Sequence, residues 1–246
     1  RLEALKAPLP ELAMAADSFL VRRGESLSII AGYHWFDDWG RDAMISLPGL
    51  LLCTGRTEEA GAVLRSFASA MKDGVLPNDL GAESYNTVDA SLWFVRAVAA
   101  YFEQCSDMPL LEELWPALLA VYSRYSRSGE GFGADEDGLI FSGPALTWMD
   151  ARVEGRPVTG RAGKCCEINA LWYSALKDMN KLQKALGRNG SPGGADFSRL
   201  ARKVKASYRR FWNSETGCLY DVIDHEDASI RPNQIIAAGV DGLLSD

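Results

Sequence analysis

Leu146-Thr147-Trp148-Met149-Asp150-Ala151 is the stretch on which the interpretation of this chain depends, together with the apolar helical pattern that opens at Glu167. In the first stretch a carboxylate closely follows a Trp, within a loop of Gly, Pro and Thr. A flat Trp face can cover the C–H face of a sugar ring, while carboxylates and amides bind its hydroxyl groups. The stretch therefore predicts either a sugar site or a capped loop with one buried Trp.

Composition narrows the possible functions. A chain of 246 residues can bury one large core or two small ones, and its net charge of −7 argues against a nucleic-acid partner. No uninterrupted apolar run approaches the length of a membrane span, so we expect no membrane partner. Five cysteines without framework spacing favour a reducing, cytoplasmic location.

Few residues suited to metal ligation are present. The chain has only two His, and the adjacent Cys165-Cys166 pair cannot easily share a tetrahedral site. A His-based zinc site and a Ser-His-Asp triad are both disfavoured for the same reason. We therefore predict no metal and no cofactor.

Apolar residues recur at spacings of three and four along most of the chain, which predicts an all-α protein with about eight helices. Because helices alternate with polar loops and no linker is evident, we expect a single domain, 1–246, built from antiparallel helical hairpins. The predicted helices cover residues 11–21, 47–53, 57 onward, 88–102, 111–125, 168–186 and 197–211, with a last apolar segment at 235–244, a short strand at 28–32 and loops at 75–79, 129–143 and 189–194.

Residues 33–42 combine aromatic side chains with three Asp and an Arg. A core strand would not carry so much charge, and a surface loop would not usually contain two Trp. Arg41 and Asp42 can form a bidentate pair that holds the loop rigid, leaving Asp38 or Asp42 to bind sugar hydroxyls. The alternative is that the aromatics pack under a charged loop.

A second polar group stands before the helix predicted from residue 88. Asn86 or Thr87 can cap that helix. Capping does not explain Asp89, which lies close to Trp93 and Phe94 on a mainly apolar helix. A buried acid at this place requires a hydrogen-bonding partner, either from the protein or from a sugar.

Five segments follow one another along the chain: YHWFDDWGRD (33–42), YNTVDASLWF (85–94), LTWMDA (146–151), EINALWY (167–173) and RPNQ (231–234). Together they resemble the glycogen debranching enzymes, specifically their C-terminal amylo-α-1,6-glucosidase domain. Differences at His34, Asp37 and Cys165-Cys166 remove none of the carboxylates. The resemblance implies an (α/α)6 toroid, related to glucoamylases, with an inverting glycosidase site at its mouth.

The resemblance also implies a substrate and roles for individual residues. The substrate is a glycogen-like α-glucan, cleaved at its α-1,6 branch points, and Asp150 is the general acid. We expect the general base, a Glu, beyond Asp246, since the chain corresponds to the N-terminal two-thirds of such a domain; a fragment of that kind should self-associate or be poorly stable. The implied substrate-binding residues are Trp35, Asp38, Trp39, Arg41, Asp42, Asn86, Asp89, Trp148, Lys164, Glu167, Asn169, Trp172 and Asn233.

A general acid must keep its proton near neutral pH, which requires burial or a neighbouring carboxylate. Glu167 either supplies that charge to Asp150 or caps its own helix. Cations aimed at Asp150 would oppose protonation, so we expect at least one of Arg161 and Lys164 to face a sugar hydroxyl or solvent. If the base lies within this chain, Glu167 and Glu83 are the next candidates.

Two other functions fit the same motifs. A toroid that binds α-glucan without cleaving it would use the same types of residue. A different six-hairpin glycosidase, such as a trehalase-like enzyme, is the third possibility. Intact Trp148 and Asp150 favour the enzyme, and five motifs in order favour the debranching family over a trehalase-like enzyme.

Overall fold

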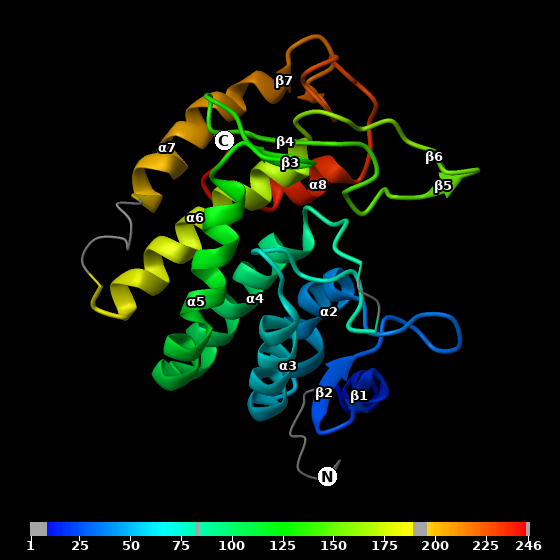
Figure 1. Ribbon diagram of the computed structural model, residues 1–246, viewed down its shortest axis with the longest axis vertical. Coiled ribbons are helices and arrows are strands. Elements are labelled where there is room, and N and C mark those ends of the chain that lie inside the picture. The colour runs from blue at the N-terminus through cyan, green and yellow to red at the C-terminus, as the bar shows by residue number, and fades with distance from the viewer. Residues whose placement is uncertain (1–8, 82–83, 189–195, 245–246) are drawn as a thin grey trace. The chain divides into compact units, whose positions relative to one another are not determined.

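The computed structural model describes residues 9–81, 84–188 and 196–244 (Figure 1). The chain groups into two compact units, residues 1–119 and 120–246, which are described in turn. The described residues form eight α-helices and four two-stranded antiparallel sheets, so the prediction of a helix-rich protein is confirmed. The loop predicted at residues 189–194 lies outside the described residues. None of the described helices is long and apolar enough to cross a membrane.

The first unit begins with a helix and a β-hairpin. Helix α1 covers Pro10–Asp17, strand β1 Leu20–Arg23 and strand β2 Ser26–Ile29. The helix predicted to continue to residue 21 was therefore wrong in its second half. Gly24 has a φ of 58° in the two-residue turn between Arg23 and Ser26, and such turns favour pairing of the flanking strands over a helix.

The next helix also differs from the prediction. Helix α2 covers Gly40–Leu47 and continues as a π-helical turn, η2, over Pro48–Leu52. The helix thus starts earlier than predicted, inside the polar aromatic segment. Because Pro48 has no N–H to donate to the preceding turn, the regular α-helical ladder cannot pass through it, and a wider turn follows.

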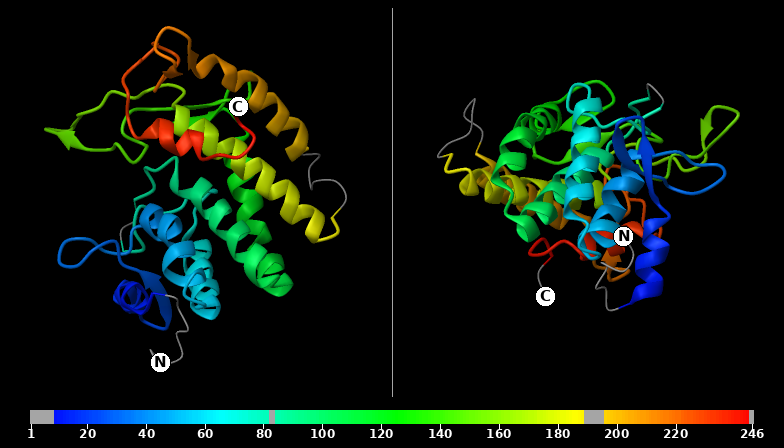
Figure 2. Two further views of the ribbon diagram at one scale, coloured as in Figure 1. Left: turned by 180° about the vertical axis from the view of Figure 1, so that it is seen from behind. Right: turned by 90° about the horizontal axis from the view of Figure 1, so that it is seen from below.

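The remaining helices of the first unit agree with their apolar periodicity. Helix α3 covers Thr57–Ala70 with two acids in its first turn, and α4 covers Ala90–Cys105. Helix α5, Met108–Tyr125, starts in this unit and ends in the second. Helix α3 packs on β2 and on α4, and α2 packs on α4; the view from behind in Figure 2 shows these neighbours. Their buried faces form the core of the unit.

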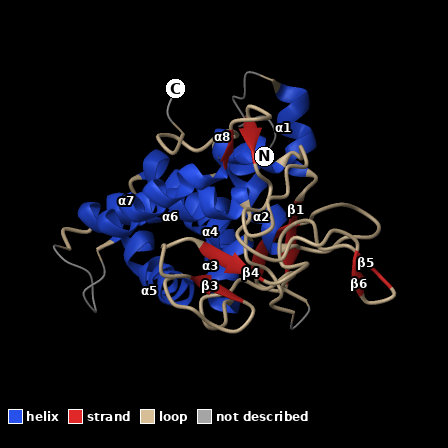
Figure 3. Cartoon of the chain, turned by 90° about the horizontal axis from the view of Figure 1, so that it is seen from above, coloured by secondary structure: helices blue, strands red, loops and turns tan. Residues whose placement is uncertain are grey.

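The second unit starts with short hairpins where the sequence predicted an irregular connection. Strand β3 covers Phe132–Ala134 and pairs with β4, Ile140–Ser142. Strand β5, Arg152–Val153, pairs with β6, Arg156–Pro157. These strands are too short to show a periodicity of two in the sequence, which explains why they were missed; Figure 3 shows them as brief ribbons within long loops.

The core of the second unit is helical. Helix α6, Cys166–Ala185, packs along α7, Phe197–Tyr208, and against α8, Asn233–Ala238 (Figure 2). Helix α7 ends in a 3-10 turn, η4, over Arg209–Phe211, and the short hairpin of β7, Trp212–Asn213, and β8, Cys218–Leu219, follows. Trp172 on α6 stacks on Tyr122 and Tyr125, with ring centroids 6.2 and 5.9 Å apart.

Candidate functional site

In the first unit, the aromatic segment forms a loop whose base is held by the backbone. Ala31 N–H donates to the Asp37 carbonyl at 2.9 Å, and Phe36 N–H donates to the Gly32 carbonyl at 3.1 Å. Trp35 at the loop's end is 83% exposed, and its ring meets that of His34 edge to face at 5.6 Å. Trp39, which is half-buried, meets Phe36 edge to face. The structure therefore presents one of the two predicted Trp side chains fully to solvent.

The segment then enters α2 through a close backbone approach. Gly40 N–H donates to the Asn78 carbonyl at 2.8 Å. A Cβ on Gly40 would lie 2.5 Å from the Pro77 carbonyl oxygen, so only glycine fits at this position. Asp38, 3% exposed, accepts from Arg23 at 2.9 Å, while its other carboxylate oxygen has no hydrogen-bond partner among the described residues.

Asp89 has the protein partner that its burial requires. The Arg41 Nε donates to Asp89 at 2.6 Å, and the Thr87 hydroxyl donates to the other carboxylate oxygen at 2.8 Å. Thr87 also accepts the Ala90 N–H at 3.3 Å, so it contributes to the cap of α4. Exposed Asn86 instead accepts from Ser84. The pairing of Arg41 with exposed Asp42 stays a prediction.

In the second unit, Arg161 forms the centre of a buried charge network. Its guanidinium makes a bidentate pair with Glu167, with both distances 2.7 Å, and a second pair with Asp221, at 2.6 and 2.9 Å. The fifth N–H reaches the Thr147 hydroxyl at 3.1 Å. All five donors of the guanidinium are thus used, and all three charged groups are at most 1% exposed.

The hydrogen-bond network continues from Asp221 to Trp148, in the stretch of residues 146–151. Arg231 Nη1 donates to Asp221 at 2.6 Å and to Asp227 at 2.7 Å. Asn233 Nδ2 donates to Asp221 at 2.6 Å, and the Asn233 amide oxygen accepts from the Trp148 indole N–H at 2.7 Å. We call Arg161, Glu167, Asp221, Arg231 and Asn233 the buried hub.

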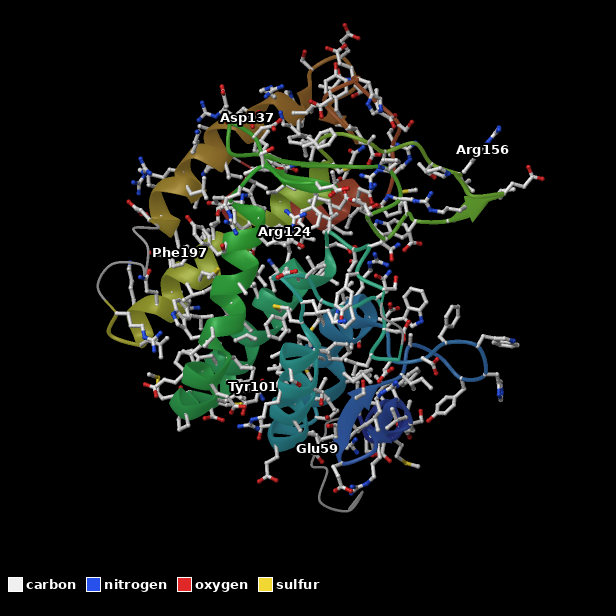
Figure 4. All side chains as sticks on the ribbon, in the orientation of Figure 1. Glu59, Tyr101, Arg124, Asp137, Arg156 and Phe197 are labelled. Carbon is white, nitrogen blue, oxygen red and sulfur yellow. The ribbon has the colours of Figure 1, made fainter. Side chains whose placement is uncertain are left out.

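Asp150 lies between the buried hub and an exposed hairpin. Trp148, 39% exposed, and Met149 precede it, and Ala151 accepts the Val158 N–H at 2.9 Å at the base of the β5–β6 hairpin. Figure 4 shows Arg156 on that hairpin pointing away from the helices of the unit. The Asp150 side chain is itself half-buried. The Asp150 carboxyl and the partly exposed Trp148 indole thus lie two residues apart on one loop.

Several residues predicted to bind substrate instead hold the protein together. Asn169 is fully buried and bonds the backbone of Ile140 through both its amide atoms, at 2.6 and 3.1 Å. Trp172 is fully buried, and its indole donates to the Gly138 carbonyl at 3.3 Å. Neither side chain presents a surface to a sugar, because both project from α6 into the protein interior and are fully buried. We therefore reassign both to packing.

Three more residues predicted to bind substrate, Lys164, Glu167 and Asn233, are also held by contacts within the protein. Lys164 Nζ lies 2.9 Å from Asp135 and 3.2 Å from Asp137, and it is nearly buried. Glu167 and Asn233 belong to the buried hub and have almost no exposed surface. The expectation that Arg161 or Lys164 faces a sugar hydroxyl or solvent was wrong, since carboxylates of the protein surround both.

Asp221 and its pairing with Arg161 could not be predicted from the sequence. The two residues are 60 positions apart, so no local spacing joins them. Charged residues are expected at the surface, and a buried one is informative only once its partner is known. The available signal was Arg231, which stands two positions before Asn233 in the RPNQ motif and shares Asp221 with it.

One group of potential metal ligands occurs in the described residues, formed by Cys166, Glu167 and Asp221. The Arg161 guanidinium is hydrogen-bonded to both of these carboxylates. Burial raises the pKa of the Cys166 thiol, which therefore stays protonated near neutral pH and is a poor metal ligand. The chemistry of this group fits an internal ion pair better than a cation site.

The second unit should lose stability in acid, because protonation of Asp227 removes a stabilising contribution. Burial raises its pKa, but hydrogen bonds from Ser229 and Arg231 outweigh that effect and lower it to about 2. Because the folded pKa lies below the ordinary value of 3.8, the contribution is complete above that pH and is lost as the pH falls towards 2. Urea unfolding of the intact protein between pH 5 and pH 2 should show a loss on the order of 2 kcal/mol from this group.

The Asp227→Asn variant is the control for this prediction. It should unfold more easily than the wild type at pH 5, and the difference should shrink towards pH 2, where about half of the wild-type carboxyl is protonated in the folded state. A constant difference between the two proteins over this range would contradict the assignment.

Two solved structures share this arrangement of elements. A GH78 family rhamnosidase of Bacillus sp. GL1 matches with a TM-score of 0.61 and 16% identity, over 81% of this chain and 20% of its own. A rhamnosidase from Klebsiella oxytoca with rhamnose bound matches with a TM-score of 0.55 and 16% identity, over 81% of this chain and 38% of its own. The fold is therefore compatible with the helical α/α-type glycosidase class.

Within that class, the family is shown by sequence. The model of the amylo-alpha-1,6-glucosidase family matches residues 14–245, and the chain belongs to this family. A glycogen debranching enzyme of Saccharomyces cerevisiae (strain ATCC 204508 / S288c) is 31% identical over 207 residues, which cover 59% of this chain. The chain spans only 14% of the length of that relative.

Proposed function

We propose that this chain is part of a glycoside hydrolase that releases glucose from α-1,6 branch points of a glycogen-like α-glucan. The observation that carries the proposal is the loop of Trp148 and Asp150, in which a carboxyl and a partly exposed indole lie two residues apart, next to the hydrogen bonds of Thr147 and Trp148 to buried Arg161 and Asn233. Membership of the amylo-alpha-1,6-glucosidase family supports the same reaction. We propose further that the helices belong to an (α/α)6 toroid.

The proposed reaction follows the inverting scheme. Asp150 donates its proton to the glycosidic oxygen, so that the glucan chain leaves as an alcohol. On the opposite face of the sugar a second carboxylate removes a proton from water, whose oxygen bonds to the anomeric carbon; the two carboxyl groups in such enzymes are roughly 6.5–9.5 Å apart.

Glu167 is unsuited to the role of general base. Both its oxygens are engaged by Arg161, and the side chain is 1% exposed, so no water on a bound sugar can reach it. Glu83, the other candidate, lies outside the described residues. We propose that the base is a Glu other than Glu167.

Substrate binding is proposed to use the residues that remain accessible. The indole of Trp148 is available for stacking on a sugar, as is that of Trp35. In the first unit Arg41 and Asp42 are the polar candidates, whereas Asp38 is buried and has one carboxylate oxygen without a hydrogen-bond partner among the described residues. All five cysteines are free, which supports a cytoplasmic location for the protein.

Replacing Trp148 by Ala should weaken binding of malto-oligosaccharide by the intact protein about ten- to hundredfold. The reason is that an aromatic side chain covered by a ligand contributes about 1.5–3 kcal/mol. Trp212→Ala is the matched control, since Trp212 is an exposed Trp of the same unit that lies outside this loop. Calorimetric titration measures both dissociation constants; equal values for the two variants would count against a stacking role.

The proposed function itself is tested by incubating the intact protein with a dextrin that carries a single α-1,6-linked glucose, and with a linear malto-oligosaccharide of equal size. Free glucose should appear from the branched substrate at a far higher rate. Binding of both without glucose from either would favour a glucan-binding module. Preferential hydrolysis of trehalose would favour a trehalase-like enzyme.

A further inference from the structure

Asn233 joins the buried hub to the accessible part of the site. It is fully buried, its amide oxygen accepts from the Trp148 indole at 2.7 Å, and its Nδ2 donates to Asp221 at 2.6 Å. The same Nδ2 lies 3.5 Å from the sulfur of Met149. Both polar atoms of this amide are hydrogen-bonded inside the protein, and because the side chain is fully buried it offers no surface to a sugar hydroxyl.

The orientation of the Asn233 amide is determined by Asp221. That carboxylate is fully buried and receives four hydrogen bonds, two from Arg161, one from Arg231 and one from Asn233. A carboxylate only accepts, so the NH2 group of Asn233 must face Asp221 and the amide oxygen must face Trp148. The indole of Trp148 is thereby held by a hydrogen bond whose direction the charges of the hub determine.

The loop is also held on the side of Arg161, which donates to the Thr147 hydroxyl at 3.1 Å. Three consecutive residues, Thr147, Trp148 and Met149, therefore contact the hub immediately before Asp150. After Asp150, the Ala151–Val158 backbone bond closes the β5–β6 hairpin. The Asp150 carboxyl thus stands on a segment that is anchored on both sides.

We propose that Asn233 and Asp221 are positioning residues, which hold the Trp148 indole and the Asp150 carboxyl in a common geometry for proton transfer to the leaving oxygen. This inference rests on the proposed function. Neither residue reaches the substrate, since both are fully buried. Their effect on the rate arises because a displacement of about 1 Å at a reacting group can reduce the rate about 10²-fold.

The test compares two substrates that differ in their need for a proton. The leaving alcohol of a branched dextrin must be protonated, whereas fluoride leaves α-glucosyl fluoride as a stable anion. In the intact protein, Asn233→Ala should lower kcat on the dextrin about ten- to hundredfold and lower kcat on the fluoride much less. A variant that only unfolds part of the protein would lose both activities in equal proportion.

A double-mutant cycle identifies the route of the effect. Trp148→Phe keeps an aromatic face but removes the indole N–H, so its effect on the dextrin rate should overlap with that of Asn233→Ala instead of multiplying with it. Tyr208→Phe is the matched control. It removes a comparable buried hydrogen bond, from the Tyr208 hydroxyl to the Cys166 carbonyl at 3.0 Å, and should combine additively with Trp148→Phe.

The outcomes separate this inference from the function on which it rests. Wild-type protein that hydrolyses neither substrate overturns the proposed function and the positioning role with it. Wild-type activity on both substrates, together with equal losses in Asn233→Ala or with additive effects in the cycle, overturns the positioning role alone. If Asn233→Ala does not fold, Trp148→Phe decides, because an unchanged ratio of dextrin to fluoride rates in that variant also overturns the inference.

Discussion

Asp150→Asn is expected to abolish glucose release from an α-1,6 branch stub by the intact protein while leaving glucan binding nearly unchanged. Asn keeps the shape of the side chain and one accepting oxygen, but it cannot deliver a proton to the leaving alcohol. General acid assistance is typically worth about 10²–10⁴-fold, and kcat should fall by an amount in that range. Initial rates and calorimetric titration, made on the same preparation, separate the two effects.

Glu154→Gln provides the control for this variant. Glu154 is an exposed carboxylate on the hairpin that follows Asp150, and the change is again from acid to amide. Its rate should stay within a small factor of the wild type. A comparable loss in both variants would mean that charge on the loop, and not proton donation by Asp150, supports the reaction.

Arg161→Met is expected to have the largest effect on stability. The substitution leaves the carboxylates of Glu167 and Asp221 buried without the cation that pairs with both. Burial by itself lowers the pKa of Arg161, but Glu167 and Asp221 outweigh that effect and raise it, so the guanidinium is charged at any working pH. Removing one partner of a buried ion pair typically costs about 3–5 kcal/mol. Urea unfolding, followed by tryptophan fluorescence, measures the change.

Arg65→Met is the matched control for that loss. Arg65 also contacts both oxygens of one carboxylate, that of Glu113, at 3.0 and 2.8 Å, but both side chains are about half exposed. Exposed pairs contribute about 1 kcal/mol or less. Similar costs for Arg161→Met and Arg65→Met would show that the buried hub is not a principal source of stability in the second unit.

The long helices could be predicted from the sequence because each buries one apolar stripe. Helices α3, α4, α6 and α7 all lie close to the segments that their periodicity indicated. Where the predicted helix boundaries were wrong, the cause lies in the local backbone. Leu20 and Val21 continue the helical spacing of α1, yet the turn at Gly24 pairs them with β2 instead. Pro48 similarly divides one predicted helix into an α-helix and a π-helical turn.

The sequence shows the motifs of the candidate site but not the contacts between its residues. Trp148 and Asp150 are recognisable from the residues around them, and Asp89 was correctly expected to need a partner. That Arg41 is this partner depends on a contact across 48 positions, which no local pattern reveals. Likewise, an Asn such as Asn233 has the same appearance in a sequence whether it binds a sugar or orients a Trp. Burial and partners, known only from the structure, separate the two roles.

The central claim is that the intact protein is an inverting glucosidase with Asp150 as its proton donor. It is tested most directly by proton NMR of the first glucose released from a singly α-1,6-branched dextrin. Inversion at the anomeric carbon predicts that β-glucose appears first from the α-linked substrate and that the α anomer forms only later by mutarotation, with no glucose signal from Asp150→Asn on the same time scale. Initial appearance of α-glucose, or an unchanged rate in Asp150→Asn, would contradict the account.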